Sequence, residues 1–216
     1  MSPITTSDLS DFVRDYRGMA IRPNPGSNTV LKGLFAFEAF KEGLQEISDS
    51  YDLSILVPET FPRDLPRVTE TAGRIPRDGK HHINADGTLC LGAPLRLLWN
   101  FSKIPSLVGF AEIFLVPFLY AMSLKLNYGI PFVFGELAHG ASGELADYVD
   151  MLGLKSPEQA KRALALLAQK KRCANKYPCP CGCGLRLGRC RFNYQIRAFR
   201  KIASRSLFKS IVERLK

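Results

Sequence analysis

The sequence predicts an α+β fold in which an N-terminal helix, an antiparallel β-meander and a loop with one cysteine precede a series of C-terminal helices. Three patterns in the 216 residues support this order. Apolar residues recur at helical spacing from Leu9 to Tyr16, apolar and polar residues alternate from Tyr51 to Val57, and residues 104–126 are the most apolar stretch. Periods of 3.6 and 2 residues are typical of amphipathic helices and half-buried strands, respectively. The chain is long enough for one domain of about 150 residues and an appendage.

The first half of the chain should contain one helix and three strands. Ser7 is the expected N-cap of the helix, which ends before Gly18. A linker with two prolines and a glycine, residues 23–28, follows. The strands are expected over residues 30–40, 44–57 and 67–75. Short connections favour antiparallel pairing of such strands.

A proline-rich connection leads from this meander to a lone cysteine. Its prolines recur every four residues, at Pro58, Pro62 and Pro66. They exclude helix and central strand, so we expect an ordered extended connection. Asp86-Gly87 is a strong turn signal, which places Cys90 on a loop after a tight reversal. The other five cysteines all lie between residues 173 and 190. By spacing alone, Cys90 is either a buried apolar residue or a nucleophile.

The residues just ahead of Cys90 favour the nucleophile. His81, His82 and Asn84 place two imidazoles and an amide on the preceding loop, where such groups can orient or stabilise an acyl intermediate. A free thiol has a pKa of about 8.5, so a small fraction is thiolate at neutral pH.

The order Phe-Pro, Pro-x-Val, His-x-Asn, Gly-x-Leu-Cys-Leu and then Trp99 resembles the ubiquitin-conjugating enzyme fold, in the divergent form found in bacterial operons. By motif the resemblance covers roughly residues 30–99, and we expect it to extend to residue 153. It implies that Cys90 carries a carboxyl group as a thioester and transfers it to an amine. It also implies that Asn84 and His82 match the asparagine and histidine of the family's His-Pro-Asn motif. Ile83 replaces the proline of that motif, and Asn84 lies six residues before the cysteine.

The same resemblance implies partners. The donor is a protein with a free C-terminus, and the acceptor is a protein that presents a lysine. In anti-phage operons of the CBASS kind, the conjugated protein is a cGAS-like nucleotidyltransferase rather than ubiquitin. No adenylating module is apparent in the sequence, so another protein is expected to activate the carboxylate.

A third histidine, His139, lies in the glycine-flanked segment 135–143. Glycines beside a histidine allow close backbone approach to a ligand, which makes His139 a further active-site candidate. A solvated loop histidine fits the same pattern.

Charge divides the chain near residue 154. Residues 155–216 contain 17 lysines and arginines and two acids, a net charge of +15. The whole chain carries +10, which leaves −5 for residues 1–154. We therefore predict a catalytic domain over 1–154 and a basic cysteine-rich tail over 155–216.

The tail predicts a structural Zn²⁺ site. Its cysteines are Cys173, Cys179, Cys181, Cys183 and Cys190. Thiolates at this density are expected to hold a tetrahedral Zn²⁺ in a segment too small for a core. The pattern resembles a SEC-C zinc knuckle, but Arg191 stands where that motif has Cys or His, so the fourth ligand is Cys173 or Cys183. Redox-active or disulfide-forming cysteines are the alternative.

Residues 192–215 alternate apolar and basic side chains at helical spacing, which predicts one or two basic amphipathic helices. They can dock on a protein, on nucleic acid or on an anionic membrane, or pack on their own domain. Two functions other than acyl transfer therefore remain open: a non-catalytic binding module built on the zinc knuckle and basic helices, and a nucleic-acid-binding protein.

The sequence also bears on localisation. It shows no secretory signal at the N-terminus, so we expect a cytoplasmic protein with reduced, metal-bound or catalytic cysteines. Residues 107–124 are about long enough to span a bilayer. Pro105, Pro117 and Glu112 interrupt the apolar stretch and favour a buried core helix instead.

Overall fold

The computed structural model describes residues 4–78, 80–133 and 141–215. They form an α+β structure with a four-stranded antiparallel sheet, which confirms the predicted class. The chain divides into two compact units, unit 1 with residues 1–91 and 103–135, and unit 2 with residues 92–102 and 136–216. The predicted boundary after residue 154 differs from this division, because residues 92–102 and the helix after residue 140 group with the tail.

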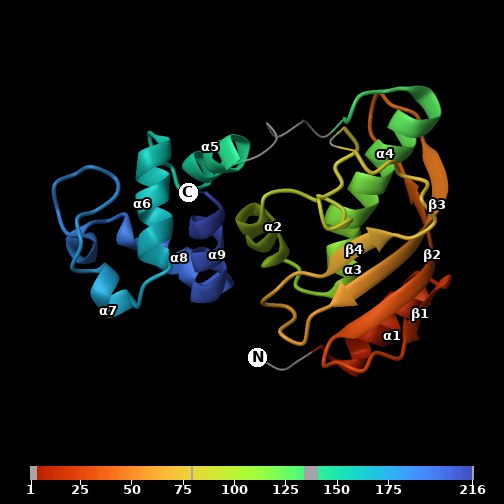
Figure 1. Ribbon diagram of the computed structural model, residues 1–216, viewed down its shortest axis with the longest axis horizontal. Coiled ribbons are helices and arrows are strands. Elements are labelled where there is room, and N and C mark those ends of the chain that lie inside the picture. The colour runs from red at the N-terminus through yellow and green to blue at the C-terminus, as the bar shows by residue number, and fades with distance from the viewer. Residues whose placement is uncertain (1–3, 79, 134–140, 216) are drawn as a thin grey trace. The chain divides into compact units, whose positions relative to one another are not determined.

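Unit 1 combines the sheet with a helical layer (Figure 1). Its elements are α1 (Thr6–Asp15), β1 (Met19–Arg22), β2 (Thr29–Ala39), β3 (Ile47–Val57), β4 (Arg67–Glu70), α3 (Leu107–Phe110), a π-helical turn (Ala111–Leu115) and α4 (Val116–Tyr128).

The sheet is a simple meander in the order β1-β2-β3-β4. The sequence predicted three of its strands and missed β1, because four residues are too few for a visible alternation. Gly33 has a φ of +148°, and a Cβ there would lie 2.1 Å from the carbonyl oxygen of Gly18. The two glycines therefore allow the start of β1 to approach β2 closely.

Helix α1 packs its aromatic residues on the sheet. Thr5, not the predicted Ser7, caps it: the Asp8 amide donates to Thr5 Oγ1 at 3.1 Å. Phe12 is fully buried, and the ring of Tyr16 stacks on Phe35 with centroids 4.3 Å apart. The predicted helical face from Leu9 to Tyr16 is thus confirmed.

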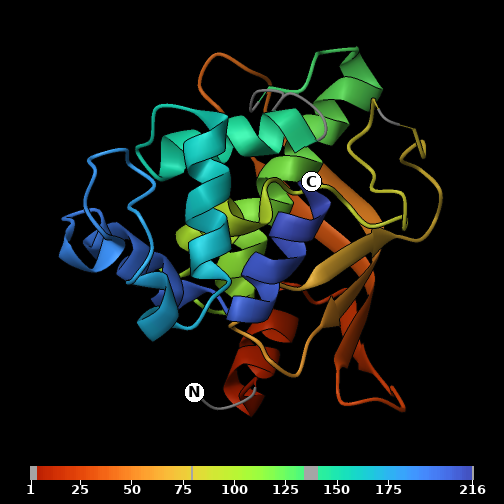
Figure 2. The same ribbon diagram turned by 60° about the vertical axis from the view of Figure 1, so that its left-hand side comes forward.

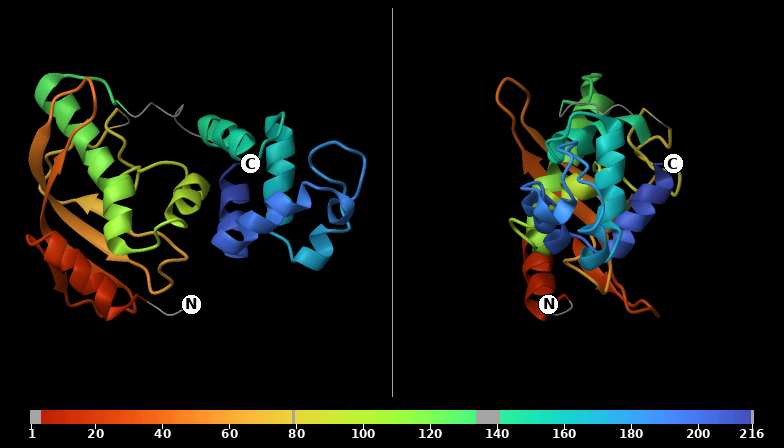
Figure 3. Two further views of the ribbon diagram at one scale, coloured as in Figure 1. Left: turned by 180° about the vertical axis from the view of Figure 1, so that it is seen from behind. Right: turned by 90° about the vertical axis from the view of Figure 1, so that its left-hand side faces the viewer.

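The most apolar stretch is the core helix of unit 1. Figure 3 shows α4 crossing the sheet. The π-helical turn lies just before Pro117, which has no amide to donate to the preceding turn. In the part of the chain that the structure describes, 107–128 is the one helical stretch long and apolar enough to cross a membrane. Because 72% of its most apolar window is buried, it is a core helix here, as predicted.

A polar network joins β3 to α4 and to the chain after β4. Arg74 donates to both carboxylate oxygens of Asp49 at 2.7 Å, and its guanidinium lies 4.3 Å from the centroid of the Tyr51 ring. The buried Ser123 hydroxyl donates to Asp49 at 2.6 Å and shares a hydrogen bond with Tyr51. Burial opposes ionisation of Asp49, yet the hydrogen bonds from Arg74 and Ser123 lower its pKa.

We expect Asp49→Asn to destabilise unit 1 by about 1–2 kcal/mol at neutral pH, because a charge-assisted pair becomes unpaired. A carboxylate whose folded pKa is lowered stabilises the fold above its unfolded pKa of about 3.9 and loses that contribution as the pH falls further. The difference between Asp49→Asn and wild type should therefore shrink as the pH falls towards 3. Urea-dependent hydrogen exchange of β3 peptides measures it. Asp52→Asn, at an exposed site on the same strand, is the control, and an equal effect there contradicts the prediction.

Unit 2 is helical. It contains α2 (Pro94–Phe101), α5 (Ala141–Met151), α6 (Pro157–Leu167), α7 (Lys171–Ala174), the 3₁₀ turn Leu187–Arg189, α8 (Asn193–Ile202) and α9 (Arg205–Arg214). Figure 2 shows α6 beside α9. The two basic amphipathic helices predicted in the tail are α8 and α9, and their apolar residues Phe199, Phe208 and Ile211 are buried.

Contacts to α2 and α6 organise this unit. Arg96 of α2 bonds Asp147 of α5 at 2.5 Å and Asp150 at 2.9 Å. Trp99 of α2 contacts Phe199 of α8, with centroids 4.8 Å apart. The Arg200 guanidinium donates to carbonyls at and just beyond the end of α6, with distances of 2.6–3.2 Å. This cation satisfies carbonyls that a helix end leaves without partners.

Candidate functional site

Cys90 lies on a loop that is bonded to the end of the sheet in unit 1. Its amide donates to the His82 carbonyl at 2.7 Å, and the adjacent Leu89 amide donates to Val68 of β4 at 2.8 Å. Leu89 is buried, whereas Cys90 is partly exposed. The buried Leu89 anchors the loop next to the partly exposed Cys90.

A tight turn between Asn84 and Thr88 sets the shape of this loop. The Asn84 amide donates to the Thr88 carbonyl at 2.8 Å, and Gly87, with a φ of +81°, donates back to Asn84 at 2.8 Å. The Asp86 carboxylate accepts from the Thr88 amide and hydroxyl and pairs with Arg67 of β4. The sequence predicted the reversal at Asp86-Gly87 but not its attachment to β4.

The Asn84 side chain is part of the same turn. Its Nδ2 donates to Thr88 Oγ1 at 3.0 Å and to the Leu89 carbonyl at 3.4 Å. An asparagine amide has two protons to donate, and both are directed within the loop. Asn84 therefore holds the segment that leads to Cys90.

His82, whose carbonyl accepts from the Cys90 amide, has a strained backbone. Its φ is +52°, the one positive value at a non-glycine residue among those described. Its ring packs on Phe132, with centroids 4.4 Å apart. Left-handed backbone at such a residue costs about 1–2 kcal/mol, and it directs the His82 carbonyl to the Cys90 amide.

His81 pairs with Asp78 rather than with Asn84. Its Nδ1 lies 2.6 Å from Asp78 Oδ1. The hydrogen bond from His81 lowers the pKa of Asp78. The predicted set Cys90, Asn84 and His82 thus lies on one loop, whereas His139 lies outside the described residues.

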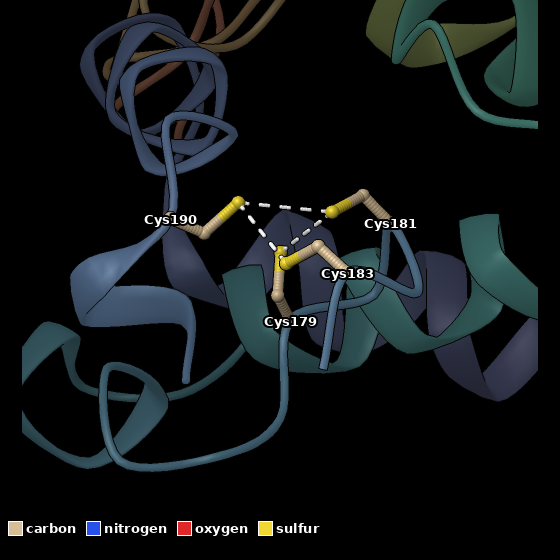
Figure 4. A group of neighbouring side chains, drawn as sticks. All are labelled: Cys179, Cys181, Cys183 and Cys190. Atoms are coloured by element: carbon tan, nitrogen blue, oxygen red, sulfur yellow. Dashed lines mark hydrogen bonds between the residues drawn. The ribbon is translucent and has the colours of Figure 1, made fainter. Parts of the chain in front are cut away.

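A second site gathers four cysteines in unit 2. Figure 4 shows the sulfurs of Cys179, Cys181, Cys183 and Cys190 pointing toward one another. All four lie within 4.8 Å of one another. Cys179 to Cys181 measures 3.2 Å, Cys181 to Cys190 3.7 Å, and Cys183 to Cys190 3.5 Å.

This donor set fits a tetrahedral metal ion. A metal with four sulfur ligands at about 2.3 Å has sulfur–sulfur edges of about 3.8 Å. Three of the observed separations are 3.2–3.7 Å, so the thiols need little movement to bind. The Phe192 amide also donates to the Cys190 sulfur at 3.4 Å, the type of bond that stabilises a thiolate.

The protonation of the cluster is uneven. Burial raises the pKa of Cys179. Burial also opposes ionisation of Cys181, but hydrogen bonds from the neighbouring thiols lower its pKa to about 7. The cluster thus contains a thiol that ionises readily, as metal binding requires.

The structure chooses between the two predicted fourth ligands. Cys183 belongs to the cluster, whereas Cys173 is exposed on α7 and is not among the four. None of the six cysteines, all of which lie in described parts of the chain, forms a disulfide, so the disulfide alternative is not present in this structure.

No protein-family model matches this sequence, and no curated protein shows significant similarity to it.

Proposed function

We propose that this protein is a cysteine-dependent acyl carrier of the ubiquitin-conjugating type. The observation that carries the proposal is Cys90 itself. It is the single cysteine in the sequence of unit 1, partly exposed at the end of a turn that Asn84 organises, on the loop that follows the four-stranded meander. The order of helix, meander, cysteine loop and core helix supports a fold similar to that of ubiquitin-conjugating enzymes.

The proposed reaction has two transfers. The Cys90 thiolate attacks an activated C-terminal carbonyl of the donor protein, held as a thioester or acyl adenylate by another protein, and expels its thiolate or AMP. A lysine amine then attacks the Cys90 thioester, loses a proton to solvent or a base, and releases the thiolate. The donor fits a cGAS-like nucleotidyltransferase in bacterial anti-phage defence, and the cytoplasm is the matching compartment.

Intact-mass measurement without reductant, on protein co-expressed with its operon neighbours, tests this proposal. Wild type should carry a reductant-labile adduct, and Cys90→Ser should hold the same mass as a hydroxylamine-sensitive ester. Cys173→Ser, at an exposed cysteine outside the cluster, is the matched control and should retain the labile adduct. An adduct that persists on Cys90→Ala, or that disappears from Cys173→Ser alone, contradicts the proposal.

Asn84 is expected to affect transfer more than stability. If its amide gives up one of its bonds to Thr88 and Leu89 and donates to the oxyanion formed on the thioester carbonyl, Asn84→Ala should slow aminolysis about 100-fold. Its side chain is exposed, so the cost to stability should be about 1 kcal/mol. Single-turnover discharge of the Cys90 thioester onto free lysine measures the rate.

Thr88→Val is the matched control for this measurement. It removes the hydroxyl that accepts from Asn84 at 3.0 Å and leaves the amide in place. We expect a reduction of less than about tenfold. Equal rates for Thr88→Val and Asn84→Ala assign Asn84 only to holding the loop and refute its direct role.

We further propose that the four-cysteine cluster binds a structural Zn²⁺. Closed all-thiolate sites without an open position are typical of structural zinc. When bound, the metal supplies a cross-link between the 179–183 turn and Cys190. The residues themselves provide the four thiolates and the Phe192 amide bond to sulfur.

A further inference from the structure

The segment around the cysteine cluster has a one-sided charge. Residues 159–212 contain 14 lysines and arginines and no aspartate or glutamate. The exposed side chains next to the cluster cysteines define what we call the hairpin surface: Lys176, Tyr177, Arg186, Arg189, Arg191 and Tyr194. This surface attracts anions because no carboxylate of the same segment offsets its charge.

Neutralisation of the cluster does not account for this charge. Four thiolates around a divalent cation carry a net charge of −2. The hairpin surface supplies four cations, and Lys170, Lys171 and Arg172 precede it by only a few residues, all exposed. A surplus of positive charge therefore remains available to a ligand.

Two tyrosines of the hairpin surface have largely exposed side chains. Tyr177 is 51% exposed and Tyr194 75%. Each lies within four residues of a cluster cysteine, Tyr177 before Cys179 and Tyr194 after Cys190. A single exposed aromatic residue is common on protein surfaces. Two of them beside the same set of metal ligands, with arginines around them, indicate a binding surface.

The backbone around both tyrosines is fixed. Leu187 donates to the Tyr177 carbonyl at 2.9 Å, and Cys179 donates to Leu185 at 2.8 Å, so Tyr177 belongs to a short hairpin. Tyr194 lies in the first turn of α8, and its amide donates to Arg191 at 3.0 Å. Because the backbone is already fixed, only the side chains of the two tyrosines lose conformational freedom when a ligand binds.

We propose that the hairpin surface binds single-stranded nucleic acid, with the arginines and Lys176 on phosphates and Tyr177 and Tyr194 as stacking platforms for bases. Cations that follow a backbone, together with exposed aromatic rings, are the combination that sequence-tolerant single-strand binding uses. Duplexes keep their bases stacked inside the helix and present none to such rings, so the two tyrosines favour a single strand. The proposal is independent of the chemistry at Cys90.

Fluorescence anisotropy with the full-length protein tests the proposal. The probes are labelled RNA and DNA single strands of about 12 nucleotides, within the usual site size, and the matching duplexes. Wild type should bind the single strands more tightly than the duplexes. Tyr177→Ala/Tyr194→Ala should bind the single strands at least about tenfold more weakly, because each lost stack is costly. Comparison of the RNA and DNA probes shows which sugar the protein prefers.

The salt dependence of the affinity distinguishes the contribution of phosphate contacts from that of base stacking. Replacing Arg186, Arg189 and Arg191 by glutamine should reduce the slope of log affinity against log salt by about 2, given about 0.7 per phosphate contact on a single strand. The tyrosine double variant should keep the wild-type slope. Tyr128→Ala and Lys32→Gln, exposed positions in unit 1, are the matched controls and should bind like wild type.

Three results overturn the proposal. The first is single-strand binding that the tyrosine double variant leaves unchanged, which means general polyanion attraction. The second is equal or tighter binding of duplex. The third is no binding of any oligonucleotide, including the case in which the protein binds vesicles that contain phosphatidylserine, which assigns the surface to a membrane. Retained metal content and circular dichroism of each variant show that its fold is intact.

Discussion

Alanine in place of Cys90 is expected to abolish acylation of lysine while unit 1 stays folded. A free carboxylate does not form an amide at neutral pH, and the proposed carrier supplies the reactive thioester through this sulfur alone. Removing a covalent nucleophile lowers the rate by on the order of 10³-fold or more. Cys90 is only partly buried, so the cost to the fold should stay near 1 kcal/mol.

This prediction is best measured with a synthetic donor. A C-terminal peptide thioester of the candidate partner bypasses the activating step, and mass spectrometry follows its transfer to free lysine. Cys173→Ala should react at the wild-type rate. If Cys90→Ala transfers the peptide at a rate similar to that of wild type, the proposed carrier function is wrong, whether or not unit 2 is folded.

Serine in place of Cys181 is expected to release the metal and unfold the hairpin. Structural zinc contributes about 10–16 kcal/mol of apparent binding free energy in small domains, and that energy is largely folding energy. Three thiolates and a hydroxyl no longer form the closed thiolate set. The hairpin packs only a few buried residues, among them Cys179 and Leu187, which cannot replace the metal.

Metal content after dialysis against a chelating resin, together with hydrogen exchange of residues 176–192, measures this effect. Wild type and Cys173→Ser should retain about one Zn²⁺ per chain. Cys181→Ser should retain almost none and exchange its hairpin amides rapidly. Wild type without metal, or equal loss from Cys173→Ser, contradicts the assignment of the four ligands.

Local periodicity was enough to predict much of unit 1. The helix from Leu9 to Tyr16, the alternation before Val57 and the apolar helix after Pro105 each bury a face that the sequence shows directly. The four residues of β1 were missed because their strand state depends on pairing with β2. The connection 58–66 was expected to be extended, but it contains turns such as Phe61 to Pro58, since proline excludes helix and strand without choosing between the remaining forms.

The sequence was enough to predict which residues form the candidate sites, but not how those residues contact one another. Cys90, the turn at Asp86-Gly87 and the cysteine-rich segment are visible in the sequence. The bonds from Asn84 to Thr88 and Leu89 depend on loop geometry. The exclusion of Cys173 depends on the start of a helix at Lys171, which fixes that cysteine on α7, apart from the hairpin. By sequence spacing alone, both Cys173 and Cys183 are close enough to the other three cysteines to be the fourth ligand.

The insertion of residues 92–102 into unit 2 restricts how such a protein can be recombined. The tail is not a contiguous cassette, because its helix α2 comes from the middle of the chain and bonds to α5 through Arg96. A gene fusion or truncation after residue 154 would separate α2 from α8, its partner through Trp99 and Phe199. Exchange of the cysteine-cluster unit between proteins would therefore need three crossovers, and the first of them would fall directly after Leu91, the neighbour of Cys90.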